Sequence, residues 1–318
     1  MSAALFGSLQ AGILYALMAL GVYLSFRILD FPDLTVDGSF VTGGAVAASM
    51  LVSGVHPISA TCSAIIAGFI AGCVTGVLHT KGKINPLLSG ILMMIALYSI
   101  NLRIMGRANV PLLNEETLFT KLASFWENTA IANVLSIDWA ILLTMTLVTF
   151  AIKFLVDAFL KTEIGLAIRA TGDNKRMIRS LSANTDWLII LGLGISNALV
   201  ALSGALVAQY SGFTDIGMGI GMIVIGLASV IIGEALFGTK TIVRTTLAVI
   251  GGAIIYRIVV ALALRVEFLE TGDMKLITAV IVIFALVAPK VIDSFKEKRR
   301  RKLRHAAANN QKDGERLA

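Results

Sequence analysis

Long apolar stretches follow one another along almost the whole chain, separated by short polar segments. A helix needs about 20 mainly apolar residues to cross the hydrocarbon core of a membrane. The second stretch is short and begins in a segment rich in Gly, Asp and Thr, so we expect a broken or partly re-entrant helix there. Nine candidate spans follow from the pattern: 5–25, 38–53, 58–78, 84–104, 138–160, 187–208, 216–237, 243–264 and 275–292. The chain is therefore predicted to be an all-α, polytopic membrane protein.

The composition excludes a soluble enzyme. Of the 318 residues, 57% are hydrophobic and 15% are charged, and the mean hydropathy is +0.85. A typical globular chain carries about 25% charged residues. The net charge of +7 is concentrated toward a basic run at Lys296–Arg304, beside an apolar body. We therefore expect the charge to face membrane lipid and not nucleic acid.

The distribution of Lys and Arg predicts the orientation. With the N-terminus outside, the inner connections hold ten of these residues and the outer connections five, and ten more lie in the tail. Positive charge collects on the cytoplasmic side of membrane proteins. The prediction is a multi-pass protein of the bacterial cytoplasmic membrane with its N-terminus outside and its C-terminus inside. The first apolar stretch lacks a basic start, so we interpret it as a retained helix and not as a cleaved signal.

The sequence also suggests an inverted repeat. A shift of 182 residues places Ala16–Leu20 on Ala198–Leu202 and Asp33 on Asp215. The matched helices are the first and the sixth span, a shift of five spans, so the two copies would cross the membrane in opposite directions; chance similarity of apolar helices is the alternative. We expect a permease domain at 1–292, with repeat halves at about 5–160 and 187–292 joined by a cytoplasmic loop at 161–186, and a basic tail at 293–318.

Placing a polar side chain inside the bilayer costs free energy, so we treat such residues as candidates for a functional site. Asp37 could equally cap a helix N-terminus. Lys153 and Asp157 are expected to pair with each other and snorkel toward water, and Arg257 to pair with an outer acid such as Glu267 or to snorkel. The candidates for a translocation pathway are Thr35, Asp37, Ser39, Asn85, Asn101 and Asn197.

Catalytic patterns are absent from the sequence. It contains no G-x-x-x-x-G-K-[ST] nucleotide loop, no H-E-x-x-H and no metal-spaced histidines. We expect no enzyme activity, no metal and no cofactor.

The connection at 161–186 is too long for a turn. Gly172 is expected to end a first helical piece, and Asp173 or Asn174 to cap a two-turn helix at Lys175–Leu181. The basic residues of this helix would suit lipid or a partner protein.

Five segments together resemble the membrane permease subunits of ABC importers for branched-chain amino acids, ribose-type sugars and related solutes. Within that family they are most similar to tryptophan or uncharacterised-solute permeases. The segments are Gly12–Leu24, Phe31–Gly44, Asn85–Gly106, Thr162–Asn174 and Ile231–Gly238, and the likeness extends over residues 5–292.

The resemblance implies a subunit that pairs with a second permease copy, with two ATPase subunits inside and with an extracytoplasmic solute-binding protein. It places residues 33–44 and 85–89 near the pathway. The solute it implies is small and polar, an amino acid, with an aromatic one as the narrower expectation. The ATPase contacts it implies are Gly172, Asp173, Asn174, Arg176 and Met177. Two alternatives stay open at this point: an ion-gradient-driven carrier or channel, and an exporter subunit or scaffold.

Overall fold

The computed structural model describes residues 2–127, 136–180 and 183–263, and five single helical positions beyond them (276, 279, 280, 283 and 287). Within this part of the chain, seven helices are long and apolar enough to cross a membrane. The long helices are α1 (Ser2–Val22, continued by a π-helix at Tyr23–Ile28), α2 (Thr35–Val52), α3 (Pro57–Thr80), α4 (Pro86–Met105), α6 (Ile137–Lys161), α9 (Thr185–Ser211) and α11 (Ile242–Ala263). The chain is an all-α, membrane-embedded protein, as its pattern predicts.

The remaining elements are short. The helices α5 (Leu118–Glu127), α7 (Glu163–Asp173), α8 (Lys175–Ser180) and α10 (Met222–Phe237) connect or supplement the long ones. The strands β1 (Asn109–Pro111) and β2 (Phe213–Asp215) pair antiparallel, with Val110 opposite Thr214.

Two of the nine expected spans differ from the prediction, and a third is outside the described residues. The second, α2, is short but unbroken over its 18 residues. The interruption falls instead at the start of the seventh, where 216–221 form turns and α10 begins only at Met222. The ninth, 275–292, lies almost wholly outside the described residues, as do the basic tail and Glu267.

Helix α9 forms the centre of the bundle and packs against α1, α2 and α3. Glycines make these contacts close. A Cβ on Gly43 would overlap the Ala201 backbone, and one on Gly72 would overlap that of Leu193. Small residues at such positions let helix backbones approach in a membrane, where packing and not water exclusion drives association.

The contact between α1 and α9 has two-fold character. Ser196 Oγ donates to the carbonyl of Gly21 at 2.7 Å, and Ser203 Oγ donates to that of Leu14 at 2.8 Å. With the 182-residue shift, Ser196 and Ser203 correspond to positions 14 and 21, so a two-fold rotation would exchange the two bonds. The helices therefore run antiparallel, in the relation that an inverted repeat requires.

The ends of the helices also match when the first part of the chain is moved by 182 residues along the sequence. Moved by 182 residues, α1 with its π-helix (2–28) falls on 184–210, beside α9 at Thr185–Ser211, and α3 falls on 239–262, beside α11 at Ile242–Ala263. The division of the chain into two halves remains a prediction, and these correspondences support it.

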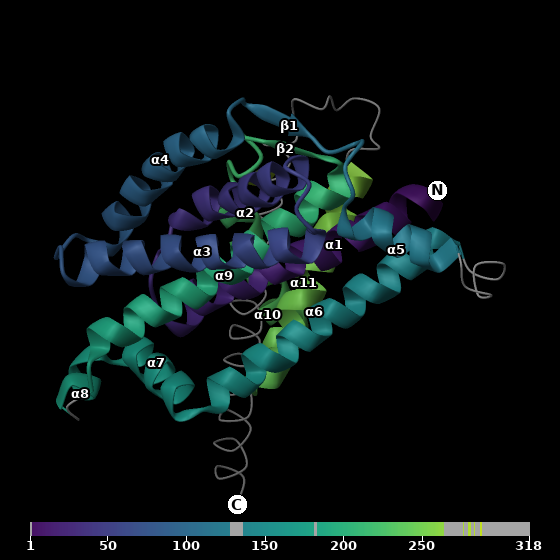
Figure 1. Ribbon diagram of the computed structural model, residues 1–318. Coiled ribbons are helices and arrows are strands. Elements are labelled where there is room, and N and C mark those ends of the chain that lie inside the picture. The colour runs from purple at the N-terminus through teal and green to yellow at the C-terminus, as the bar shows by residue number, and fades with distance from the viewer. Residues whose placement is uncertain are drawn as a thin grey trace, which may run out of the picture.

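The bundle has two distinct ends (Figure 1). The β1–β2 ribbon lies at one end, which we call the ribbon end, and α7 and α8 lie at the other, which we call the α7–α8 end. Helices α2 and α4 run toward the ribbon end, and α10 runs away from it. This arrangement makes the beginnings of α2 and α10 meet inside the bundle.

Candidate functional site

The beginnings of two helices meet at Asp37. This residue is in the first turn of α2, and its carboxylate accepts hydrogen bonds from the start of α10: Oδ2 from the amide of Gly221 at 3.0 Å and Oδ1 from that of Ile223 at 2.8 Å. The first amides of a helix have no partner within it, and they carry the positive end of the helix dipole. One side chain of α2 therefore both caps α10 and neutralises its N-terminus.

The segment before α10 is held tightly against this carboxylate. A Cβ on Gly219 would overlap the carbonyl of Asp37, so only glycine fits there. Gly221 has φ +88°, which also favours glycine. Asp37 lies about four turns, roughly 22 Å, before the end of α2 at about 1.5 Å per residue. The turns at 216–221 are thus non-helical backbone deep within the span, which proteins tolerate where it is buried or lines an aqueous cavity.

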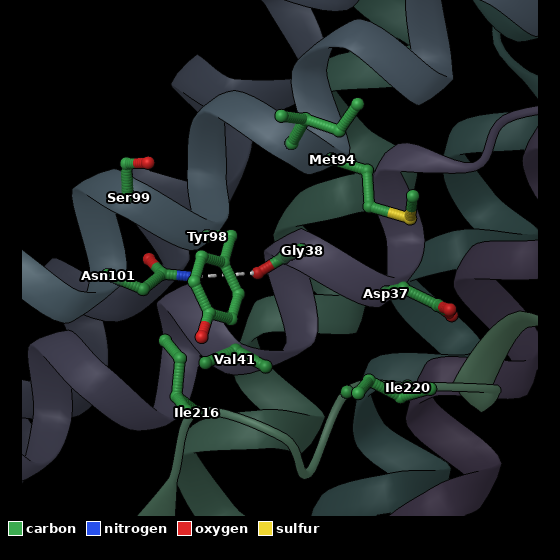
Figure 2. Close-up of a pocket in the computed structure, with 11 residues that line it drawn as sticks. Asp37, Gly38, Val41, Met94, Tyr98, Ser99, Asn101, Ile216 and Ile220 are labelled. Carbon is green, nitrogen blue, oxygen red and sulfur yellow. Dashed lines mark hydrogen bonds between the residues drawn. The ribbon is translucent and has the colours of Figure 1, made fainter. Parts of the chain in front are cut away.

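A cavity of about 410 Å³ opens beside this segment (Figure 2). Its walls come from the first half of α2, the middle of α4 and the turns before α10. In Figure 2, Met94 and Tyr98 from α4 approach it from one side and Ile216 and Ile220 from the other. The lining residues are Asp37, Gly38, Val41, Met94, Ile95, Tyr98, Ser99, Asn101, Ile216, Gly219 and Ile220.

Asn101 fixes the crossing of α4 over α2. Its Nδ2 donates to the carbonyl of Gly38 at 3.1 Å, the bond drawn in Figure 2, and the residue is 1% exposed. A Cβ on Gly38 would lie 2.8 Å from the side chain of Leu97, so glycine allows the close crossing. Asn101 therefore shapes one wall of the cavity by positioning α4.

A second polar cluster holds the linker between the π-helix and α2. Asn197 Nδ2 donates to Asp33 Oδ2 at 2.7 Å, and the amide of Thr35 donates to Asp33 Oδ1 at 2.9 Å. The hydroxyls of Thr35 and Thr75 lie 2.8 Å apart. Asp33, Thr35, Thr75 and Asn197 are fully buried, so this cluster ties the linker to α3 and α9.

The structure separates the six predicted pathway residues into three groups. Asp37 and Asn101 line the cavity. Thr35, Ser39 and Asn197 are fully buried in packed interfaces and do not line it. Asn85 is exposed at the α7–α8 end, where its side chain caps α4 by accepting from the amide of Leu87 at 3.0 Å.

The charged residues within the spans have contacts that differ in part from the prediction. Lys153 Nζ does bind Asp157 Oδ2, at 2.6 Å, but both side chains are buried and do not snorkel. Thr246 of α11 donates to Asp157 Oδ1 at 2.7 Å, so the pair joins α6 to α11. The guanidinium of Arg257 stacks on Tyr15, 3.6 Å from the ring centroid. Among the described residues no cluster of His, Cys, Asp or Glu could hold a metal ion.

The loop between α6 and α9 folds into two helices at the α7–α8 end. Helix α7 ends at Asp173, one residue after the expected end at Gly172, and α8 follows from Lys175. A Cβ on Gly172 would overlap the carbonyl of Ile28. The predicted cap at Asn174 is confirmed, since its Oδ1 accepts from the amide of Met177 at 3.1 Å. Asp173, Asn174, Arg176 and Met177 are exposed.

Three cavity residues had no clear signal in the sequence. Met94, Ile95 and Ile220 are apolar residues in apolar stretches, and nothing distinguishes them from side chains that face lipid. Tyr98 could be either a packing or a recognition residue by its type alone. Only the meeting of α2, α4 and the turns before α10 reveals them.

Known proteins match the chain over most of its length. It is 45% identical over 285 residues to the tyrosine transport system permease protein of Clostridioides difficile (strain R20291), covering 90% of this chain and 91% of that protein. It is 34% identical to an uncharacterized protein of Rickettsia prowazekii (89% and 96% covered) and 26% identical to the ribose import permease protein of Escherichia coli K12 (72% and 68% covered). No solved structure matches significantly.

The comparison with protein families covers the described bundle almost completely. The family model for the branched-chain amino acid transport system / permease component matches residues 4–287. This range includes every described helix except the first two residues of α1. The chain therefore belongs to the family of permease components of branched-chain amino acid transport systems.

Proposed function

We propose that this chain is the transmembrane permease subunit of an ATP-driven importer of a small polar solute, an amino acid. ATP hydrolysis would take place on separate ATPase subunits, because the sequence has no nucleotide-binding loop. A solute-binding protein outside would deliver the solute, and a second copy of the permease would complete the membrane unit. The tyrosine permease of C. difficile, 45% identical, supports the amino acid as solute class.

The observation that carries the proposal is the exposed helix pair α7–α8. It lies directly between two long helices, α6 and α9, and it is held by the backbone contact of Gly172 with Ile28 at the end of the π-helix. A force applied to α8 would therefore reach α1, α6 and α9. Asp173, Asn174, Arg176 and Met177 are the residues we expect to touch the ATPase, and Gly172 serves to dock α7 onto the permease.

The orientation follows from the same assignment. The α7–α8 end would face the cytoplasm, with Arg27, Arg169 and the basic residues of α8, and the ribbon end would face the outside. Alternating access then requires movement around the point where α2 and α10 meet, near the middle of the bundle, as in transporters built from inverted repeats.

The test is assembly with the ATPase. We expect the unmodified permease to co-purify with its ATPase and to stimulate hydrolysis. The double variant Arg176→Glu/Met177→Asp should lose both by about tenfold or more, as expected for central interface residues, while it still folds because both positions are exposed. Lys81→Ala, at another exposed position of the same end, is the matched control.

Full ATPase binding by the double variant would contradict the coupling assignment. Uptake driven by an ion gradient without any ATPase would identify a secondary carrier instead.

A further inference from the structure

The cavity beside α4 has the character of a water-filled space and not of a surface against lipid. Tyr98 is 53% exposed in the middle of α4, and its hydroxyl makes no hydrogen bond to any residue in the described part of the chain. The carboxylate of Asp37 and the turns at 216–221 form other parts of the wall. An unpartnered hydroxyl, a carboxylate and irregular backbone are costly against lipid tails, so water or solute is expected to occupy the cavity.

The walls suit a flat apolar group. The cavity volume of about 410 Å³ falls in the range of small-molecule sites. An aromatic ring, Tyr98, lies beside the flexible thioether side chain of Met94, with Ile95, Val41 and Ile220 around them. Ring pairs stack favourably and sulfur makes good contacts with aromatic edges. A sugar would instead bring hydroxyls that need polar partners, and this cavity offers few of them.

The cavity also has one charged end. Asp37 is the only charged side chain among the described residues that line it, and each of its oxygens accepts one amide at the start of α10, which leaves further lone pairs for a ligand. Asn101, one turn after Tyr98, binds the carbonyl of Gly38 next to Asp37. Tyr98 and Asp37 therefore both border the cavity near the place where α4 crosses α2.

We infer that this cavity holds an aromatic amino acid during transport, with its ring against Tyr98 and Met94 and its ammonium group toward Asp37. The inference rests on the proposed function as an amino acid permease, and it adds the class of side chain and the residues that select it. Tyr98 and Met94 are assigned as specificity-determining residues.

The experiment uses the complete transporter, with ATPase and binding protein, in proteoliposomes. Both native cysteines are removed (Cys62→Ala, Cys73→Ala), and Ile95→Cys places a reporter on the cavity wall while Tyr98 is kept. We expect an anionic, water-soluble methanethiosulfonate to label the reporter. L-tyrosine should slow the labelling strongly, L-leucine much less and D-ribose not at all. Leu143→Cys, exposed on α6 but outside the cavity lining, is the matched control and should stay unlabelled in lipid.

The second part of the experiment replaces the aromatic ring of Tyr98. Tyr98→Leu should raise the L-tyrosine concentration that half-protects the reporter by about three- to tenfold, the range expected for one aromatic pair. Tyr98→Phe keeps the ring and removes only an unpaired hydroxyl, so it should leave this concentration within about twofold. Equal protection by tyrosine and leucine, or no effect of Tyr98→Leu, would overturn the inference.

The remaining outcomes separate this inference from the proposed function. An unlabelled Ile95→Cys variant, or ATP-driven tyrosine uptake without any protection, would reject the cavity as the site and leave the permease assignment intact. If the unmodified transporter moved no amino acid at all, the proposed function itself would fail.

Discussion

Asp37 is the residue on which the interior of the bundle depends, because its carboxylate supplies the cap of a neighbouring helix. Asn in its place would keep one accepting oxygen and turn the other into a donor facing an amide. We expect Asp37→Asn to lower the free energy of unfolding by about 1.5–3 kcal/mol, the value of a hydrogen bond to a charged group. Transport, measured as ATP-driven uptake, should fall as well, because the turns at 216–221 that line the cavity lose a hydrogen bond that holds them to α2.

The control for this change is Asp30→Asn. Asp30 is exposed and has φ +50°, a conformation that Asn also tolerates. We expect it to leave thermal stability unchanged and uptake within about twofold of the unmodified protein, as for most exposed substitutions. Equal stability of the Asp37 and Asp30 variants would show that the bonds to Gly221 and Ile223 contribute little.

Sequence reasoning could find only part of the cavity at the scale of residues. Asp37 and Asn101 are polar residues in apolar stretches. Because a polar side chain inside the bilayer costs free energy, the sequence identifies both as candidate site residues. The same criterion selected Thr35, Ser39 and Asn197, which the structure buries between helices. A polar residue satisfied in a helix contact and one lining a cavity have the same sequence signal. Apolar lining residues have no such signal, because their role comes only from a tertiary contact.

At the scale of elements, the hydropathy pattern predicts the membrane spans but not the non-helical turns at 216–221. Residues 216–221 alternate apolar side chains with glycine, so their mean hydropathy resembles that of a helix. What ends the helix there is Gly219 against the carbonyl of Asp37 and the positive φ of Gly221. The first contact depends on α2, 182 positions earlier, and so it cannot be read from the local pattern. The cap at Asn174, by contrast, is a local interaction and was predicted.

The attachment of α6 to α11 gives a prediction at this scale. Lys153, Asp157 and Thr246 form a buried polar contact between the two helices. Lys153→Met would leave a buried carboxylate without its cation, which costs about 3–5 kcal/mol when a buried pair is broken. We expect a clear drop in melting temperature, measured on the purified protein.

The double variant Lys153→Met/Asp157→Leu is the informative comparison. Replacing a whole buried pair by apolar residues is often neutral, and the hydroxyl of Thr246 can then donate to the carbonyl of Val243, 3.1 Å away. The double variant should therefore be more stable than Lys153→Met alone. If the two variants lose stability equally, the unpaired carboxylate of Asp157 costs little, and the loss comes from other contacts of the lysine, such as that of its Nζ with the Phe154 ring at 4.8 Å.

At the scale of the whole molecule, the reciprocal bonds of Ser196 and Ser203 join α1 and α9, which run in opposite directions as the predicted inverted repeat requires. Under the 182-residue shift, Asp37 corresponds to Gly219, and these two residues touch each other. A point that contacts its own counterpart lies on the two-fold axis. On the predicted division into two halves, the cavity beside it would lie between them, and relative movement of the halves would open it first to one end and then to the other.

Alternating access to the cavity requires that the two ends of the bundle face opposite sides of the membrane. This orientation can be measured directly. In the cysteine-free protein, Ser53→Cys marks the exposed end of α2 at the ribbon end, and Ser180→Cys marks α8. The excess of Lys and Arg at the α7–α8 end predicts that this end is cytoplasmic. A membrane-impermeant maleimide should thus label the Ser53→Cys variant in intact cells and the Ser180→Cys variant only after permeabilisation. The reverse pattern would place α8 outside, beyond the reach of an ATPase, and the coupling role of Arg176 and Met177 would then be impossible.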